Sequence, residues 1–228
     1  MTFEAAMRAT EVLLGVAFFL QSLEHLATPG SGRHLYLVRA VLAVGLVVGF
    51  ASAVFLAALF VTSLALLVRH NGPYNGGADR MGMLILICLC AAHAAGSSDW
   101  REIALGYLAV QLVLSYAISG WVKIVNPDWR SGRALRDVFA FSAYPVSREL
   151  RGWANWPRLL AAMGWAVMVF ELLFPLAFFH TFTLIAALVV AAMFHLTNAC
   201  LFGLNRFFWI WIAAYPSIMW FQGRVLGS

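Results

Sequence analysis

The only lysine in the chain, Lys123, is the residue best suited to chemistry, because fourteen arginines supply every other fixed positive charge. Burial can lower the pKa of an amine until it accepts a proton, whereas a guanidinium stays protonated. Polar residues precede Lys123 at intervals of four, Gln111, Ser115 and Ser119, which predicts a polar face along one helix. Position alone favours a lysine that extends from the helix end to the lipid headgroups. The polar residues downstream favour a buried base instead.

Three further polar residues lie inside apolar runs downstream of Lys123, and each needs a partner or a function. A charged group at a helix centre in a bilayer costs about 2.5–3.5 kcal/mol, so Glu171 is expected to be protonated or paired. His195 and Asn198 are three residues apart and therefore share a helix face. Alone, that pair would predict hydrogen bonds between two helices. Together with Lys123 and Glu171 in one bundle, it favours a chemical site.

The first half of the chain holds weaker candidates. A glycine-rich loop between two apolar segments carries His70 and Asn71, and it is either a tight structured turn or a loop that lines a site. Glu24 and His25 end the first apolar segment, where an interfacial ion pair is the preferred interpretation. His93 lies near the end of its segment and is interpreted as a satisfied core or interface histidine.

The composition is that of a polytopic membrane protein. The 228 residues are 63% hydrophobic and 11% charged, with a mean hydropathy of +0.84, which leaves no room for a sizeable soluble domain. The net charge of +5 comes from arginines between the apolar segments, so it indicates orientation in the membrane and not nucleic acid binding. Three cysteines in apolar runs, two of them as CxC, give little support to a zinc or dithiol site, and no metal is expected.

The sequence predicts an all-α integral membrane protein, a helical bundle of about eight transmembrane segments that forms a single membrane domain over residues 1–228. The long apolar stretch 35–68 is about twice the length of one crossing, and we place a break near Gly49. The segments are expected at roughly 9–27, 34–49, 51–69, 81–96, 101–125, 158–179, 181–202 and 205–222.

One long connection, 126–157, is rich in charges and tryptophan, which predicts short amphipathic helices at the membrane interface. Asn155 and Pro157 are the expected cap and first turn of the next spanning helix. Of the fifteen lysines and arginines, twelve lie on the side of the odd-numbered loops. Those loops are therefore predicted to be cytoplasmic, with both termini outside.

Two blocks in the second half resemble the membrane domain of the vitamin K-dependent gamma-carboxylase and its bacterial relatives, the horizontally transferred transmembrane (HTTM) domain family. One block is Phe-His-x-x-Asn-x-x-Leu-Phe at 194–202, followed by an aromatic-rich helix that ends in Pro216. The other contains Gly120, Lys123 and the sequence Asp-Trp-x-x-Gly at 128–132. The order of the blocks and the distance between them also agree, whereas the first half is similar mainly in its helix pattern.

The resemblance implies a lysine base. In the animal enzyme the lysine of this block deprotonates vitamin K hydroquinone, and the anion reacts with oxygen to give a strong base. That base removes a gamma proton from a protein-bound glutamate before CO2 adds. Lys123 is the matching residue here, and the expected cofactor is vitamin K hydroquinone or another menaquinol-like quinol, with O2 and CO2 as co-substrates. The residues expected to bind the quinol or polarise its oxygens are His195, Asn198, Glu171, His70 and Asn71.

The expected partners are the lipid bilayer, a lipophilic quinol, and a peptide substrate or a partner protein that supplies a soluble domain. The expected location is the bacterial inner membrane. The main alternative is a non-catalytic membrane subunit or maturation factor for a secreted peptide or a small redox protein. A quinone-linked redox protein fits the size, but the sequence has no dithiol, haem or flavin motif. A transporter is disfavoured because no inverted repeat is present.

Overall fold

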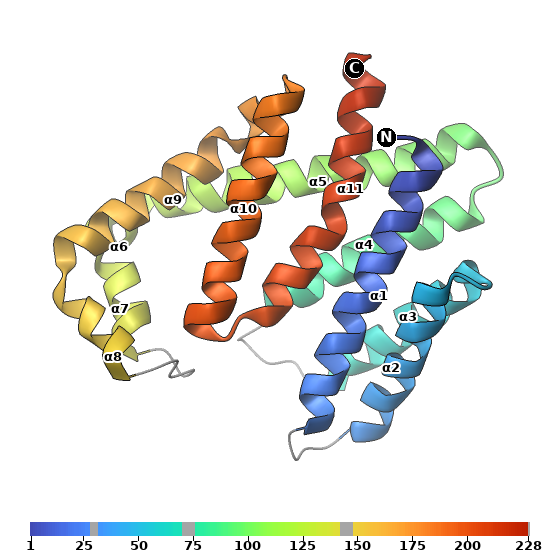
Figure 1. Cartoon of the computed structure of the whole chain (residues 1–228), viewed down its shortest axis with the longest axis horizontal. Helices are drawn as coiled ribbons and strands as arrows, with labels where there is room; N and C mark the ends of the chain where they lie inside the picture. Colours follow the sequence, from blue (N-terminus) through green and yellow to red (C-terminus); the bar gives the residue numbers. More distant parts are fainter. Residues whose placement is uncertain (28–31, 70–75, 142–147, 228) are drawn as a thin grey trace. The chain divides into compact units, whose positions relative to one another are not determined.

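The computed structural model describes residues 1–27, 32–69, 76–141 and 148–227, and every regular element in these ranges is a helix (Figure 1). The predicted all-α class is confirmed. His70 and Asn71 lie outside the described residues.

The residue contacts divide the chain into two compact units. Unit 1 comprises Met1–Val110 and Arg206–Ser228, and unit 2 comprises Gln111–Asn205. One long helix, α5 (Ser98–Val125), contributes its first half to unit 1 and its second half to unit 2. That residues 1–228 form a single membrane domain stays a prediction.

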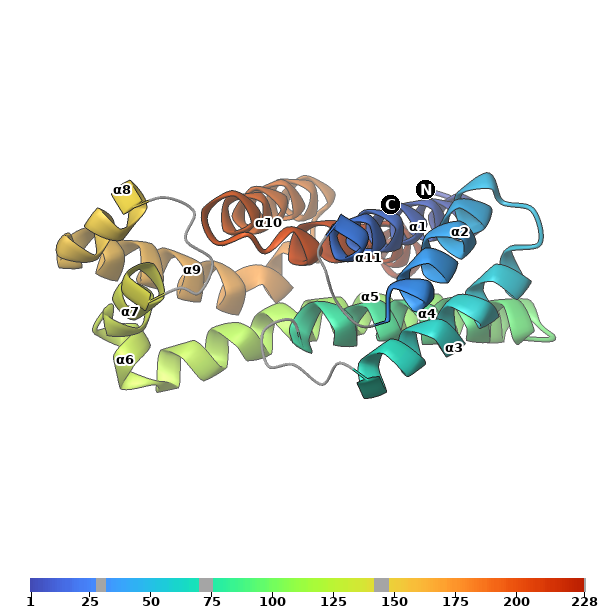
Figure 2. The same ribbon diagram turned by 90° about the horizontal axis from the view of Figure 1, so that it is seen from below.

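Unit 1 is a set of antiparallel helices in which α1 packs against α2 and α4, and α3 packs against α2 and α4. The two views agree that α1 and α2 lie side by side (Figures 1 and 2). The remaining helix of unit 1 is α11, whose proline at position 216 lies inside the helix. The bounds are α1 (Phe3–Ala27), α2 (Arg33–Val48), α3 (Ser52–Arg69), α4 (Gly76–Ala94) and α11 (Asn205–Leu226).

The predicted break in the long apolar stretch is found at Gly49. This residue adopts the left-handed conformation, with φ of 86°, and its N–H donates to the carbonyl of Gly45, which ends α2. A Cβ at this position would lie 2.7 Å from a guanidinium nitrogen of Arg8, so both the backbone and the space require glycine.

Unit 2 consists of the second half of α5, the long helices α9 and α10, and the short helices of the 126–157 connection. The helix α7 packs against α9 and the 3₁₀ helix η1, and α10 packs against α9. The amphipathic helices predicted for this connection are present, and their position at a membrane interface stays a prediction. The bounds are α6 (Pro127–Arg130), α7 (Arg133–Phe141), α8 (Arg148–Arg151), η1 (Gly152–Asn155), α9 (Pro157–Ala177) and α10 (Thr181–Phe202).

The start of α9 agrees only in part with the sequence prediction. Pro157 is its first residue, as expected, but the capping position is Trp156 and not Asn155. The reason is that Asn155 is the last residue of η1, so the chain is still in a helical turn where the cap was predicted. Trp156 makes no side-chain cap, and the proline needs none at its missing N–H.

Each of the eight predicted apolar segments corresponds to one long helix in the described ranges. Five of these helices, α3, α4, α5, α9 and α10, are long and apolar enough to cross a membrane. The predicted number of about eight crossings is not confirmed by length and composition. One reason is that α2 has only 16 residues, or about 24 Å, which is shorter than the roughly 30 Å of a hydrocarbon core.

Candidate functional site

In unit 2 the amine of Lys123, near the end of α5, contacts the carboxylate of Glu171 in α9. The Nζ atom lies 2.6 Å from Oε1 and 2.5 Å from Oε2, so it donates to both oxygens. Glu171 is only 3% exposed and the Lys123 side chain 18%. The amine is therefore held inside the unit by a buried carboxylate, which does not fit a lysine that extends to the headgroups.

The two helices approach most closely one turn before Lys123, at Gly120. A Cβ at Gly120 would lie 2.6 Å from the backbone nitrogen of Leu172 and 3.1 Å from the Cβ of Glu171. Only glycine allows this distance between helix backbones. The glycine and the lysine of one sequence block thus act together, because Gly120 brings Glu171 within reach of Lys123.

The acidic-tryptophan part of the same block positions an aromatic ring beside the amine. The side chain of Asn126 accepts a hydrogen bond of 2.9 Å from the backbone N–H of Asp128 and so caps α6. This short helix presents Trp129, whose ring centroid lies 5.4 Å from the Lys123 Nζ. A cation–π contact of this kind adds to the stabilisation of an ammonium ion.

The glycine that ends this block, Gly132, allows the chain at the start of α7 to pack closely against α9. Gly132 has φ of 77°, and a Cβ there would lie 2.8 Å from the Cα of Ala161. The indole of Trp165 also donates to the carbonyl of Arg130, at 3.1 Å. The short helices after Lys123 are therefore attached directly to the helix that carries Glu171.

His195 of α10 is also buried in unit 2, and its Nε2 lies 2.9 Å from the hydroxyl of Tyr116 in α5. The ring of Tyr116 stacks on Phe174 at 4.2 Å between centroids. Phe174 lies one turn after Glu171 on α9, and Tyr116 lies two turns before Lys123 on α5. The two pairs are therefore neighbours along α5, and the Tyr116–Phe174 stack links the second pair, which ends on α10, to the helix that carries Glu171.

The row of polar residues predicted along α5 is less buried than the row beside it. Leu112, Tyr116 and Gly120 are buried, whereas the polar residues at 111, 115 and 119 are only half-buried. The hydroxyl of Ser115 donates to the carbonyl of Leu112 within its own helix. Sequence analysis missed Tyr116, although its spacing of seven from Lys123 places both on one helix face.

Asn198 stands apart from these pairs. It is half-buried in the last turns of α10, and its carbonyl accepts the N–H of Gly203, which ends the helix. No hydrogen bond of its side chain is found among the described residues.

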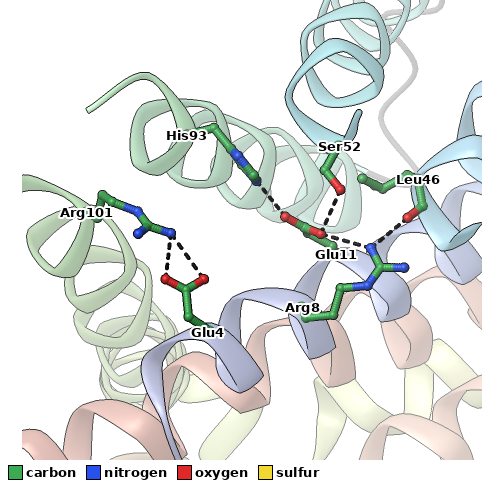
Figure 3. A network of polar contacts seen from close by, with 7 residues as sticks. All are labelled: Glu4, Arg8, Glu11, Leu46, Ser52, His93 and Arg101. Carbon is green, nitrogen blue, oxygen red and sulfur yellow. Dashed lines mark hydrogen bonds and ion pairs between the residues drawn. The ribbon is translucent and has the colours of Figure 1, made fainter. Parts of the chain in front are cut away.

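Unit 1 contains a second buried carboxylate that sequence analysis did not single out as a site (Figure 3). Glu11 of α1 is 3% exposed, and its Oε1 lies 2.6 Å from the Nε2 of His93 in α4. Its Oε2 accepts from Arg8 at 2.9 Å and from Ser52 at 3.1 Å. The interpretation of His93 as a satisfied histidine is confirmed. Its partner is 82 residues away in sequence, so no local pattern could have identified the contact.

No group of three or more histidine, cysteine, aspartate or glutamate residues within the described ranges could hold a metal ion. Cys88, Cys90 and Cys200 are free thiols. Cys88 is buried as expected of a small hydrophobic residue, but Cys200 is exposed on α10.

Comparison with known proteins gives one match. The model of the HTTM domain matches residues 16–222, which is nearly the whole chain. No curated protein and no solved structure was found to match.

Proposed function

The chain belongs to the HTTM domain family, and we propose that it is a membrane enzyme that removes a proton from a hydroxyl of a lipid-soluble hydroquinone. The apolar helices support an integral membrane protein. The family match relates it to the membrane domain of the carboxylase. The observation that carries the proposal is the buried contact between Lys123 and both oxygens of Glu171.

The pair provides a route for the proton. In a water-poor site the two separated charges are poorly solvated, so transfer of a proton from the ammonium to the carboxylate gives a neutral amine and a carboxylic acid. The neutral amine then accepts the proton of the hydroquinone hydroxyl. The products are an ammonium ion, a hydroquinone anion and a protonated Glu171, so the substrate proton has in effect been passed to the carboxylate through Lys123.

The neighbouring polar groups suit the binding of a quinol ring. The Tyr116–His195 pair lies two turns along α5 from the amine and is able to orient a ring oxygen by hydrogen bonding. Asn198 contributes an amide on the same helix as His195. We assign these residues to the quinol, which is vitamin K hydroquinone or a menaquinol-like molecule, and propose O2 and CO2 as co-substrates with a peptide glutamate as acceptor. Roles for His70 and Asn71 stay predictions.

In the membrane, we propose that the helices other than the five clear candidates also cross or enter the bilayer, giving about eight segments. Both α1, with 25 residues, and α11, with 22, have the length for it. The arginine-rich odd-numbered loops would then face the cytoplasm of a bacterial inner membrane.

The test is Lys123→Arg in purified protein reconstituted into lipid. Arginine keeps the positive charge and the ion pair with Glu171, but it cannot give up a proton at working pH. We expect oxygen-dependent quinol consumption or epoxide formation to fall by roughly 10²- to 10⁴-fold, the usual contribution of a general base. The matched control is Arg133→Lys on the exposed side of α7, which should keep full activity. Monodisperse size exclusion checks folding in both variants.

Two outcomes would contradict the proposal. Full turnover by Lys123→Arg would exclude Lys123 as the base. A wild-type protein that consumes no quinol of any tested chain length would favour the alternative, a non-catalytic subunit or maturation factor.

A further inference from the structure

Unit 1 contains a buried arginine whose hydrogen bonding is incomplete. Arg39 of α2 is only 4% exposed, and its Nε donates to the hydroxyl of Ser22 in α1 at 3.0 Å. The guanidinium carbon lies 5.1 Å from the ring centroid of Phe18 and 5.3 Å from that of Tyr36. The Nη2 atom is buried and has no hydrogen-bond partner among the described residues.

No carboxylate of the described ranges lies within ion-pair distance of Arg39. The nearby acids are held by other side chains: Asp79 accepts from Gln21 at 3.3 Å, and Glu24 lies 3.7 Å from Arg206. A buried charge without a counter-ion is costly, and a buried N–H without an acceptor adds a further penalty. Asp79 supplies a negative charge nearby, but no carboxylate oxygen of the described ranges contacts the guanidinium, so Nη2 lacks a direct acceptor.

A second arginine, Arg206, and several helix ends lie in the same part of unit 1 as Arg39. Contacts of Arg206 with His25 and Glu24 bring the first turn of α11 to the last turns of α1. The contact of Asp79 with Gln21 brings the first turn of α4 to the same part of α1, and Gly77 of α4 lies against Phe207 of α11.

The first turns of α4 and α11 and the N-terminal half of α2 thus surround the last turns of α1. His25 stacks on Tyr36 of α2 at 4.1 Å. The N-termini of α2, α4 and α11 lie in this region together with the C-terminus of α1.

We propose that Arg39 is the centre of a binding site for a phosphate-type oxyanion, carried either by a lipid headgroup or by free phosphate. A guanidinium fork pairs with two oxygens of such a group, and Nη2 is the nitrogen that still has an acceptor to gain. Arg206 lies at the rim of the site, where its side chain is 16% exposed. This site belongs to unit 1 and is independent of the quinol chemistry proposed for unit 2.

The experiment compares Arg39→Met with the wild-type chain in detergent and in nanodiscs. Inorganic phosphate, titrated at constant ionic strength, should raise the melting temperature of the wild type in a saturable manner. Nanodiscs of phosphatidylglycerol should do the same relative to phosphatidylcholine if the source is a lipid. Arg39→Met should abolish the shift and melt no lower than the ligand-free wild type, because it removes an uncompensated buried charge.

Arg224→Met is the matched control. It removes the same charge from the other end of α11, where Arg224 pairs with Glu102 at 2.9 Å, and should keep the full shift. Should Arg39→Met not fold, Arg39→Lys keeps the charge without the fork and should weaken phosphate binding at least tenfold. An unchanged shift in the Arg39 variant that folds, or no shift with either phosphate source in the wild type, overturns the proposal.

Discussion

Glu11 and Glu171 are both 3% exposed, yet they are stabilised in different ways. Glu11 accepts contacts from Arg8, Ser52 and His93, which belong to α1, α3 and α4 (Figure 3). Among the described residues Glu171 has one basic partner, Lys123, whose Nζ contacts both of its oxygens. Glu11 therefore connects three helices of unit 1. Glu171 connects two helices of unit 2 through the amine of Lys123 alone among the described residues.

The difference separates a structural role from a chemical one. Arg8 also donates to the carbonyls of Leu46 and Val47, the last ones of α2, so the Glu11 network closes a helix end as well. A carboxylate surrounded by several fixed donors has little freedom to exchange a proton. Glu171 shares its charge with one amine, and that amine can pass a proton to a third group.

The largest effect on stability is expected from Glu11→Leu. This change removes the acceptor that Arg8, Ser52 and His93 share. The side chains of Arg8 and His93 are 39% and 27% exposed, so water replaces part of the lost contact, and we expect a cost of about 1–3 kcal/mol. The apparent melting temperature in detergent should fall by several degrees, with loss of monodispersity on mild heating. The control is Glu4→Leu, whose carboxylate pairs with Arg101 but is 70% exposed, and it should cost at most about 1 kcal/mol. Equal losses of melting temperature in the two variants would contradict a structural role of Glu11.

A double substitution at the other carboxylate should behave differently. Glu171→Leu alone leaves a buried ammonium and should destabilise the protein, whereas Lys123→Met with Glu171→Leu should regain most of the stability. We expect a coupling of about 2 kcal/mol in a double-mutant cycle measured by thermal or SDS unfolding. The double variant should be folded and inactive. Activity in the folded double variant would show that the pair has no chemical role.

The sequence was sufficient to predict the long helices but not to predict which side chains contact one another. Apolar runs located all eight long helices, since hydrophobic length and glycine breaks such as Gly49 are local properties. Glu171 was expected to need a partner because of its depth, and Lys123 to carry chemistry because it is the only lysine. Their contact, across 48 residues, depends on the crossing of α5 and α9 at Gly120, which no periodicity reveals.

The missed residues have the same cause. Gln111, Ser115 and Ser119 are spaced by four, but so are the buried residues of the adjacent row, Leu112, Tyr116 and Gly120, so the spacing alone does not show which row faces the interior. Tyr116 could have been found from its interval of seven to Lys123, which places the two residues near the same helix face. Glu11 was passed over because its partners come from α3 and α4, far along the chain.

The smallest expected effect concerns Tyr116, which the comparison assigns to the chemical region as a positioning residue. Tyr116→Phe removes the hydroxyl that lies 2.9 Å from the Nε2 of His195 and keeps the ring stacked on Phe174. One hydrogen bond should cost about 0.5–1.5 kcal/mol of stability. If His195 orients the quinol, the KM for quinol should rise several-fold with kcat nearly unchanged, because binding and not proton removal is weakened. Tyr107→Phe, at an exposed position of the same helix, should change neither value. A loss of kcat as large as that expected for Lys123→Arg would instead place the Tyr116 hydroxyl in the proton-transfer step itself.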